Sequence, residues 1–217
     1  MMGMTQLLLF QDFIKKFPLR HYKKGEIIVC EGVSPQKSYA IKAGFVKVFL
    51  TTKNGEEKAV AFNTTHDILP LAWTFKKSET PLYYYQAFTD CEAYEVPRES
   101  ILDYTNTNPD MFRQLCNYLL DLDIDLKQHI HSLEQAKASD KIMHAFHFLA
   151  RRFGEKLDSA NVRMLLPLTQ QDLANFLGLT RETTGAQLKD LQQKGVITYQ
   201  QQEYIVHTDR LRAALEA

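Results

Sequence analysis

The sequence predicts an α+β protein with a β-rich N-terminal half and a helical C-terminal half. Short runs rich in β-branched and aromatic residues fill residues 20 to 98, and apolar residues recur at helical spacing after Asn108. Near the C-terminus, two short helices with capping residues flank a Gly turn. At 217 residues the chain is long enough for one or two domains, and we expect two.

The composition is that of a folded protein without an overall charge. Apolar residues make up 45% of the chain and charged residues 24%. The 26 Lys and Arg residues balance 26 Asp and Glu residues. Any surface that binds nucleic acid must therefore be local.

Cysteine usage and the first residues bear on the compartment. The three cysteines, Cys30, Cys91 and Cys116, are odd in number and widely spaced. This fits a reducing compartment and neither a disulfide framework nor a zinc site, so we predict a cytoplasmic protein without a metal. The apolar stretch at residues 7 to 10 is broken at once by Gln11 and Asp12, so we expect neither a signal peptide nor a membrane span.

The N-terminal half begins with a short amphipathic helix over residues 6 to 17, which Pro18 ends. Four β-rich runs follow, EIIVCEG, SYAIKAGFVKVFLTT, EKAVAFN and QAFTDCEAYEV. Asn54-Gly55 joins two of them, and this pair tolerates the positive φ angles of a hairpin turn. The pattern predicts an antiparallel barrel or sandwich over residues 20 to 98.

A long helix is predicted over residues 109 to 137, after Asn108-Pro109. Its stripe positions follow alternating steps of three and four residues and are Phe112, Leu115, Leu119, Leu122, Leu126, His129, Leu133 and Ala136. So narrow a seam favours pairing with a second copy about a twofold axis, with His129 fixing the register. The alternative is that the stripe packs on the chain's own barrel. We interpret Asp121, Asp123 and Asp125, beside the seam, as a solvated face.

A second domain is predicted to start at residue 138. Ser139 can cap a helix that reaches Phe153, and Gly154 can end it. Residues 158 to 164 are polar and indicate a loop or a short strand.

The segment LTQQDLANFLGLTRETTGAQLKDLQQKG, residues 168 to 195, predicts a helix-turn-helix. Thr169 and Asp172 have capping-box spacing, which starts a helix over residues 170 to 177. Gly178-Leu179-Thr180 makes a tight turn, and Thr180 caps a second helix over residues 181 to 194. Gly195 ends that helix, and VITYQQQEYIVH then predicts two short strands, a wing.

The outer face of the second helix carries groups that suit DNA. In the major groove, the guanidinium of Arg181 can donate two hydrogen bonds to O6 and N7 of guanine. The carboxylate of Glu182 can accept a hydrogen bond from N4 of cytosine. The free amides near Thr169 and Gln170 suit phosphate oxygens. Further backbone contacts are predicted for Thr180, Thr183, Gln187 and Lys189. The alternative interpretation is that these two helices form a hairpin that only packs on neighbouring elements of the fold.

The stretch LTRETTGAQLKDLQQKGVI resembles the recognition helix of the cyclic-AMP receptor protein and fumarate-nitrate reduction (CRP/FNR) regulators, commonly S-R-E-T-V-G-R-x-L-x-x-L. The resemblance follows the chain in order. It implies a double-stranded β-helix, the β-roll of cyclic-nucleotide-binding-like domains, as a sensor over residues 1–108. A dimerisation helix over 109–137 and a winged helix-turn-helix domain over 138–217 complete the implied fold.

By this resemblance the protein is a homodimeric transcription regulator that binds double-stranded DNA and RNA polymerase. Arg181 and Glu182 match the family's first two base-reading positions, and Thr183 matches a phosphate contact. The third reader, usually Arg, is Ala186 here. We therefore expect the DNA half-site of this protein to differ at one base pair from the half-site that the family commonly reads.

The same resemblance argues against a cyclic nucleotide. The Gly-Glu pair that holds the ribose in nucleotide-binding relatives becomes Pro70 and Leu71, and the Arg-Ser pair for the phosphate becomes Pro81 and Leu82. No other Arg lies between Arg20 and Arg98. An iron-sulfur cluster needs four cysteines and only three are present. We expect no cofactor and no cyclic AMP.

Apolar side chains surround the lost nucleotide pocket. They line an effector site for an apolar ligand or simply fill the barrel, and the candidates are Leu71, Trp73, Leu82, Tyr83, Tyr84 and Tyr85. Haem would need an axial donor from among His21, His66, Cys30 and Cys91. The alternative function is thus a small-molecule or haem sensor or carrier with a vestigial winged domain. The chain lacks Gly-x-Ser-x-Gly, His-Glu-x-x-His and phosphate-loop motifs, so we predict no enzyme.

Overall fold

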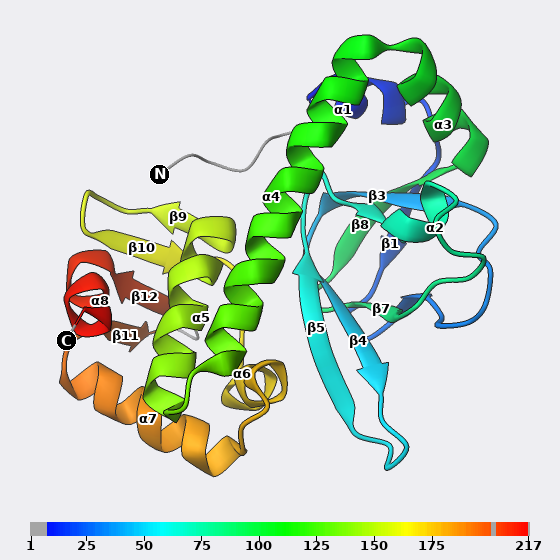
Figure 1. Ribbon diagram of the computed structural model, residues 1–217. Helices are drawn as coiled ribbons and strands as arrows, with labels where there is room; N and C mark the ends of the chain where they lie inside the picture. Colours follow the sequence, from blue (N-terminus) through cyan, green and yellow to red (C-terminus); the bar gives the residue numbers. More distant parts are fainter. Residues whose placement is uncertain (1–7, 201–202, 217) are drawn as a thin grey trace. The chain divides into compact units, whose positions relative to one another are not determined.

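The computed structural model describes residues 8–200 and 203–216 (Figure 1). Its contacts divide the chain into two compact units, with the boundary between Leu119 and Leu120. That boundary falls inside the predicted dimerisation helix, so this helix is not a domain of its own. In the part of the chain that the structure describes, every helix is too short or too polar to cross a bilayer.

The N-terminal unit is a β-roll of two four-stranded antiparallel sheets (Figure 1). One sheet has the order β1-β8-β3-β6, with bounds Leu19–Tyr22, Cys91–Val96, Ser38–Ala43 and Ile68–Leu69. The other has the order β2-β7-β4-β5, with bounds Ile27–Val29, Tyr84–Ala87, Val46–Thr51 and Glu57–Asn63. Alternate side chains of both sheets point inward and form one apolar core around Ile41, Val46 and Leu69. The predicted antiparallel β domain is confirmed.

The connection between β4 and β5 is the predicted hairpin. Thr51 pairs with Glu57, and the Thr52 amide donates to the Glu56 carbonyl at 2.9 Å. Within this connection only Gly55 has a positive φ, 79°. Asn54 therefore does not use the left-handed conformation that the Asn-Gly pair suggested, because the loop is longer than a two-residue turn.

Three short helices accompany the sheets. α1, Leu8–Ile14, is the observed part of the leading helix; residues 6 and 7 of that prediction lie outside the described residues, and the helix ends three residues before the predicted Phe17. α2, Leu71–Thr74, and α3, Arg98–Thr107, were not predicted. α2 is a single turn, and in α3 only Ile101 and Thr105 are buried, so neither shows an apolar stripe in the sequence.

α4, Pro109–Glu134, begins in this unit. Met111, Leu115 and Tyr118 are buried there. The Tyr118 hydroxyl donates to Asp67 Oδ1 at 2.8 Å, and Asp67 is itself buried and accepts from the Thr64 amide at 2.8 Å. A buried carboxylate in the turn before β6 thus anchors the first half of α4 to the β-roll.

The C-terminal unit packs helices on a small sheet of order β11-β12-β10-β9. Its elements in chain order are α5 Ala138–Phe153, β9 Gly154–Lys156, β10 Asn161–Met164, α6 Gln170–Leu177, α7 Arg181–Gln193, β11 Ile197–Gln200, β12 Glu203–His207 and α8 Thr208–Leu215. The core lies between α5, α6 and α7, where Phe146, Leu173 and Leu188 are buried. The predicted α+β class, with a β-roll, a long helix and a winged helix-turn-helix, is confirmed.

The start of α5 differs from the prediction. Lys137, not Ser139, occupies the N-cap, and it makes no side-chain cap bond. Ser139 lies inside the first turn, where its hydroxyl donates to Asp140 Oδ1 at 2.9 Å. The helix ends at Phe153 before Gly154, as predicted.

The second half of α4 is fastened to the C-terminal unit by polar contacts. Asp125 is buried and forms ion pairs with Arg151 and Arg152 of α5. The prediction of a solvated face is therefore wrong for Asp125. His129 is also buried, with its Nε2 3.1 Å from the Phe176 carbonyl oxygen and its ring 3.9 Å from the Phe176 ring.

The predicted seam of α4 consequently mixes two faces of the helix. Leu115 and His129 lie inside the protomer and cannot belong to an exposed seam as predicted. Leu122 and Leu133 are partly buried, whereas Phe112, Leu119 and Leu126 are exposed. α4 ends at Glu134, so residues 135 to 137 are not part of it.

Candidate nucleic-acid interface

α6 begins with the predicted capping box. The Thr169 hydroxyl oxygen accepts from the Asp172 amide at 3.1 Å, and Asp172 Oδ2 accepts from the Thr169 amide at 3.0 Å. These two hydrogen bonds provide partners for two backbone amides that have none within the helix itself. Leu173, Ala174 and Leu177 are buried, so the short helix is fixed on its inner side.

The turn between α6 and α7 depends on Gly178. It takes φ 65° and ψ 35°, a left-handed conformation that a Cβ would disfavour. The Leu179 amide then donates to the Ala174 carbonyl at 3.0 Å, which closes the end of α6. Thr180 follows in extended conformation, and its hydroxyl oxygen accepts from the Thr183 amide at 3.1 Å to cap α7.

α6 and α7 approach each other closely at Gly185. A Cβ on Gly185 would lie 3.0 Å from Gln170 Oε1, so only a residue without a side chain fits here without displacing Gln170. This contact sets the first turn of α6 beside the middle of α7. The observed helix-turn-helix therefore matches the predicted one in its caps and turn, and α7 ends one residue earlier than predicted.

α7 has a buried side and an exposed side. Thr184, Leu188 and Leu191 are buried against the rest of the unit. The predicted base-reading positions, Arg181, Glu182 and Ala186, are all exposed. Of the predicted backbone contacts, Thr169, Gln170, Thr180 and Lys189 are exposed, whereas Thr183 and Gln187 are partly buried. The three predicted base-reading positions thus lie on the exposed side of α7.

The charge of this surface is local. Residues 138–216 contain ten Lys or Arg and nine Asp or Glu residues. Arg163 pairs with Glu155, and Lys194 pairs with Asp190 at 2.7 Å. Arg181 and Lys189 are exposed cations on α7 itself. A phosphate backbone would meet these cations and the helix amides rather than a broadly basic surface.

The predicted wing is an antiparallel pair. β11 and β12 align Tyr199 with Tyr204, and their rings lie 4.6 Å apart. Tyr204 is buried, and Tyr199 is exposed. The tip of the wing, residues 201–202, lies outside the described residues.

Two family models match the chain in sequence. A cyclic nucleotide-binding domain matches residues 19–108, and a Crp-like helix-turn-helix domain matches residues 113–214. Among curated proteins, the transcriptional activator protein FnrA of Stutzerimonas stutzeri is 26% identical over 90% of this chain and 78% of its own length. Electron transport regulator A of Shewanella oneidensis is 26% identical over 86% of this chain and 73% of its own length.

Solved structures agree on the fold. FixK2 from Bradyrhizobium japonicum superposes with a TM-score of 0.76 at 20% identity, covering 91% of this chain and 96% of that one. A CooA mutant from Carboxydothermus hydrogenoformans gives a TM-score of 0.78 at 20% identity, covering 97% and 96%. The chain belongs to the CRP/FNR family. Members of this family are transcription regulators that act as dimers, bind DNA through the helix-turn-helix and are not enzymes.

In this CRP/FNR protein the positions that matched the family's ribose and phosphate contacts lie at the start of α2 and in the loop before β7. Pro70 precedes α2 and Leu71 is its first residue. Pro81 is buried, and its carbonyl oxygen accepts from the Gly32 amide at 2.9 Å, whereas Leu82 is exposed. These side chains offer neither a cation nor a hydrogen-bonding group.

The six candidate effector residues are spread over α2, the following loop and β7. Trp73 is buried, its Nε1 donates to Ser34 Oγ at 3.0 Å, and the Arg98 guanidinium lies 4.5 Å from its ring. Tyr85 packs on the core of the β-roll, where burial raises its pKa to about 12. Tyr84 stacks on Phe49 at 5.3 Å, and Tyr83 is partly buried. The buried members of this set are thus already packed against the protein itself.

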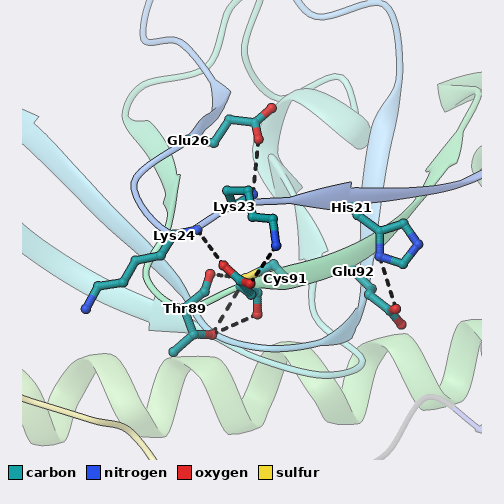
Figure 2. A network of polar contacts seen from close by, with 8 residues as sticks. His21, Lys23, Lys24, Glu26, Thr89, Cys91 and Glu92 are labelled. Carbon is teal, nitrogen blue, oxygen red and sulfur yellow. Dashed lines mark hydrogen bonds and ion pairs between the residues drawn. The ribbon is translucent and has the colours of Figure 1, made fainter.

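The candidate haem donors stand in different surroundings, and Figure 2 shows two of them, His21 and Cys91. His21 is exposed and pairs with Glu92 at 3.2 Å. Cys91 is buried, its Sγ donates to the Phe45 carbonyl at 3.0 Å, and burial raises the pKa of this thiol. Beside it, the Lys24 amide and Lys23 Nζ both donate to Asp90. Cys30 is exposed, and His66 Nδ1 lies 2.9 Å from Gln11 Nε2.

Three histidines form a cluster in the C-terminal unit, and two of them, His144 and His147, share one face of α5 at a spacing of three residues. Gln128, His131, His144, His147 and Leu215 line a cavity of about 290 Å³. The rings of His131 and His144 are 4.4 Å apart. Among the residues that the structure describes, no three side chains are placed to hold a metal ion.

Burial, and then His131 and His147, lower the pKa of His144 below its ordinary 6.5, against a weaker effect of Asp140. Burial, Arg151 and Arg212 likewise lower the pKa of His147. The unfolded chain therefore takes up these protons at a higher pH than the folded chain does. We expect the free energy of unfolding to be highest above pH 6.5 and to fall as the pH drops below 6.5, until the folded histidines are protonated too.

Urea unfolding at several pH values between 7.5 and 5 measures this loss. His144→Gln should make the dependence of the unfolding free energy on pH flatter, because it removes one of the groups whose pKa is lowered in the folded chain. If the unfolding free energy of wild type and of His144→Gln depended equally on pH, the lowered pKa assigned to His144 would be contradicted.

Proposed function

We propose that the protein is a homodimeric transcription regulator that reads a near-palindromic operator through α7. One observation carries the proposal: Arg181 and Glu182 are exposed at the capped N-terminal end of a helix whose opposite side is buried. An α-helix fits the major groove, and recognition helices contact base edges with residues near their N-terminus. Thr169, Gln170 and Thr180 are exposed on the same motif and suit phosphate oxygens. RNA polymerase is the partner that such regulation requires.

The surface proposed for pairing is an apolar stripe on α4. It consists of Phe112, Leu119, Leu126 and Ile130, which are 57%, 42%, 58% and 50% exposed. These positions follow steps of seven and four residues and share one face of the helix, with Cys116 and Asp123 between them. An exposed apolar stripe on a helix is costly in water, and a second copy about a twofold axis covers it. We name these four residues the α4 stripe.

For the β-roll we propose a sensor that does not bind cyclic nucleotides. A cyclic phosphate needs a cation and a ribose needs an acceptor, but Pro70, Leu71, Pro81 and Leu82 offer neither. Residues 21 to 97 contain no Arg. Isothermal titration with cyclic AMP and with cyclic GMP should give no saturable heat. Saturation at micromolar nucleotide would overturn this part of the proposal.

Selection from a random pool of DNA duplexes tests the DNA-reading function. The protein should enrich a motif with twofold symmetry, because each subunit presents one α7. Enrichment should weaken as salt is raised, since phosphate contacts release counterions. A pool that converges on no symmetric motif would contradict the proposed function.

A further inference from the structure

The outward side of α7 carries an alanine at its centre. Thr184, Leu188 and Leu191 are buried, and Glu182, Ala186 and Lys189 are exposed. Glu182 and Ala186 are four residues apart, so they lie about 6 Å apart along the axis and only about 40° apart around it. When α7 lies in a major groove with Glu182 at one base edge, the methyl group of Ala186 would therefore face a base edge that follows it.

The residues next to Ala186 in the chain do not cover this methyl group. Gly185 has no side chain, and a Cβ added to it would point toward Gln170 of α6. Gln187 is partly buried and lies about 100° further around the helix. Ala186 itself is exposed, so its methyl group is the group that this part of α7 offers to the groove.

A methyl group can discriminate between bases because it forms no hydrogen bonds with the base edge that it covers. It can make an apolar contact with the 5-methyl group of thymine, which is the apolar group that the major groove presents. Against a G·C pair it covers hydrogen-bonding groups of the base edges without a partner, and this is unfavourable. The contact therefore favours a pair that contains thymine.

We propose that Ala186 is a specificity-determining residue that selects thymine at one position of each half-site, through contact between its side-chain methyl group and the 5-methyl group of the base. This inference rests on the proposed function, because it requires α7 to lie in the major groove. It adds the identity of one base that α7 selects.

The test compares thymine with deoxyuridine, which lacks only the 5-methyl group. Selection with wild type and with Ala186→Gly first identifies the position whose base preference depends on residue 186. Replacing thymine by deoxyuridine there should weaken wild-type binding about fourfold in one half-site and on the order of tenfold in both, the size expected for one buried methyl group. The same replacement at another thymine of the motif is the control.

Two variants separate the contact from effects on the helix. Ala186→Gly should bind thymine and deoxyuridine duplexes equally, and Ala186→Ser keeps a Cβ while replacing the apolar surface by a hydroxyl, so it should lose most of the thymine preference. If Ala186→Gly is unfolded by circular dichroism, Ala186→Ser decides the comparison.

Each outcome is decisive. Equal wild-type affinity for thymine and deoxyuridine, on a motif that is still symmetric, would overturn the role of Ala186 and leave the proposed function intact. Failure of wild type to select any symmetric motif would overturn both.

Discussion

Arg181→Ala is expected to weaken binding to the selected operator at least about 30-fold while leaving the fold unchanged. A bidentate contact between Arg and guanine contributes roughly 1–3 kcal/mol of discrimination, and a twofold operator contains it twice. Arg181 is exposed in the first turn of α7, which Thr180 caps independently of it. Electrophoretic mobility shifts with operator and with unrelated DNA measure the ratio of the two affinities, which should fall by the same factor.

Gln192→Ala is the matched control, because Gln192 is exposed on the same helix near its C-terminal end. It should change operator affinity less than about threefold, as expected for a residue beyond the reading end of the helix. Tight and selective binding by Arg181→Ala would mean that another element reads the bases.

Leu126→Glu is expected to convert the dimer into monomers and to lower operator affinity with it. Leu126 is 58% exposed in the α4 stripe, and pairing about a twofold axis would place two introduced carboxylates in an apolar contact. A monomer contacts one half-site, so the affinity gained from the second reading helix is lost. Analytical ultracentrifugation gives the mass, and a mobility shift gives the affinity.

Leu157→Glu is the comparison for this change, since Leu157 is 48% exposed but lies between β9 and β10, away from α4. It should remain dimeric and bind as wild type does. A Leu126→Glu protein that sediments as a dimer would exclude the α4 stripe as the pairing surface.

The sequence predicted the helix-turn-helix well because its signals are local. A capping box, a Gly turn and a second cap each involve residues within a few positions of one another, and all appear in the structure at Thr169, Gly178 and Thr180. An antiparallel barrel or sandwich was predicted from strand composition for the same reason, whereas its β-roll form was implied only by the family resemblance. The exact turn at Asn54-Gly55 was not, because loop length changed the conformation that the pair adopts.

The seam of α4 was predicted less well because its pattern is ambiguous. Steps of three and four residues are satisfied by two adjacent faces of one helix, and only tertiary packing tells them apart. Leu115 is buried in the N-terminal unit, and Phe176 of α6 contacts His129. Asp125 was misjudged for a related reason, since its partners Arg151 and Arg152 are distant in sequence.

The α2 region was beyond prediction for a different reason. A single helical turn has no periodicity to detect, so aromatic residues there were assigned to strands or to a pocket. The structure instead places Trp73 in α2 with its indole NH on Ser34 and its ring beneath Arg98.

Hydroxyl-radical footprinting of the wild-type protein on its selected operator tests the central claim most directly, since it measures where two copies of α7 meet one duplex. Two protected segments of the sugar-phosphate backbone should appear on the same side of the DNA, with their centres about 10 base pairs or a multiple of that apart. A single protected segment, or two whose spacing matches no whole number of helical turns, would contradict a symmetric particle that reads DNA through Arg181 and Glu182.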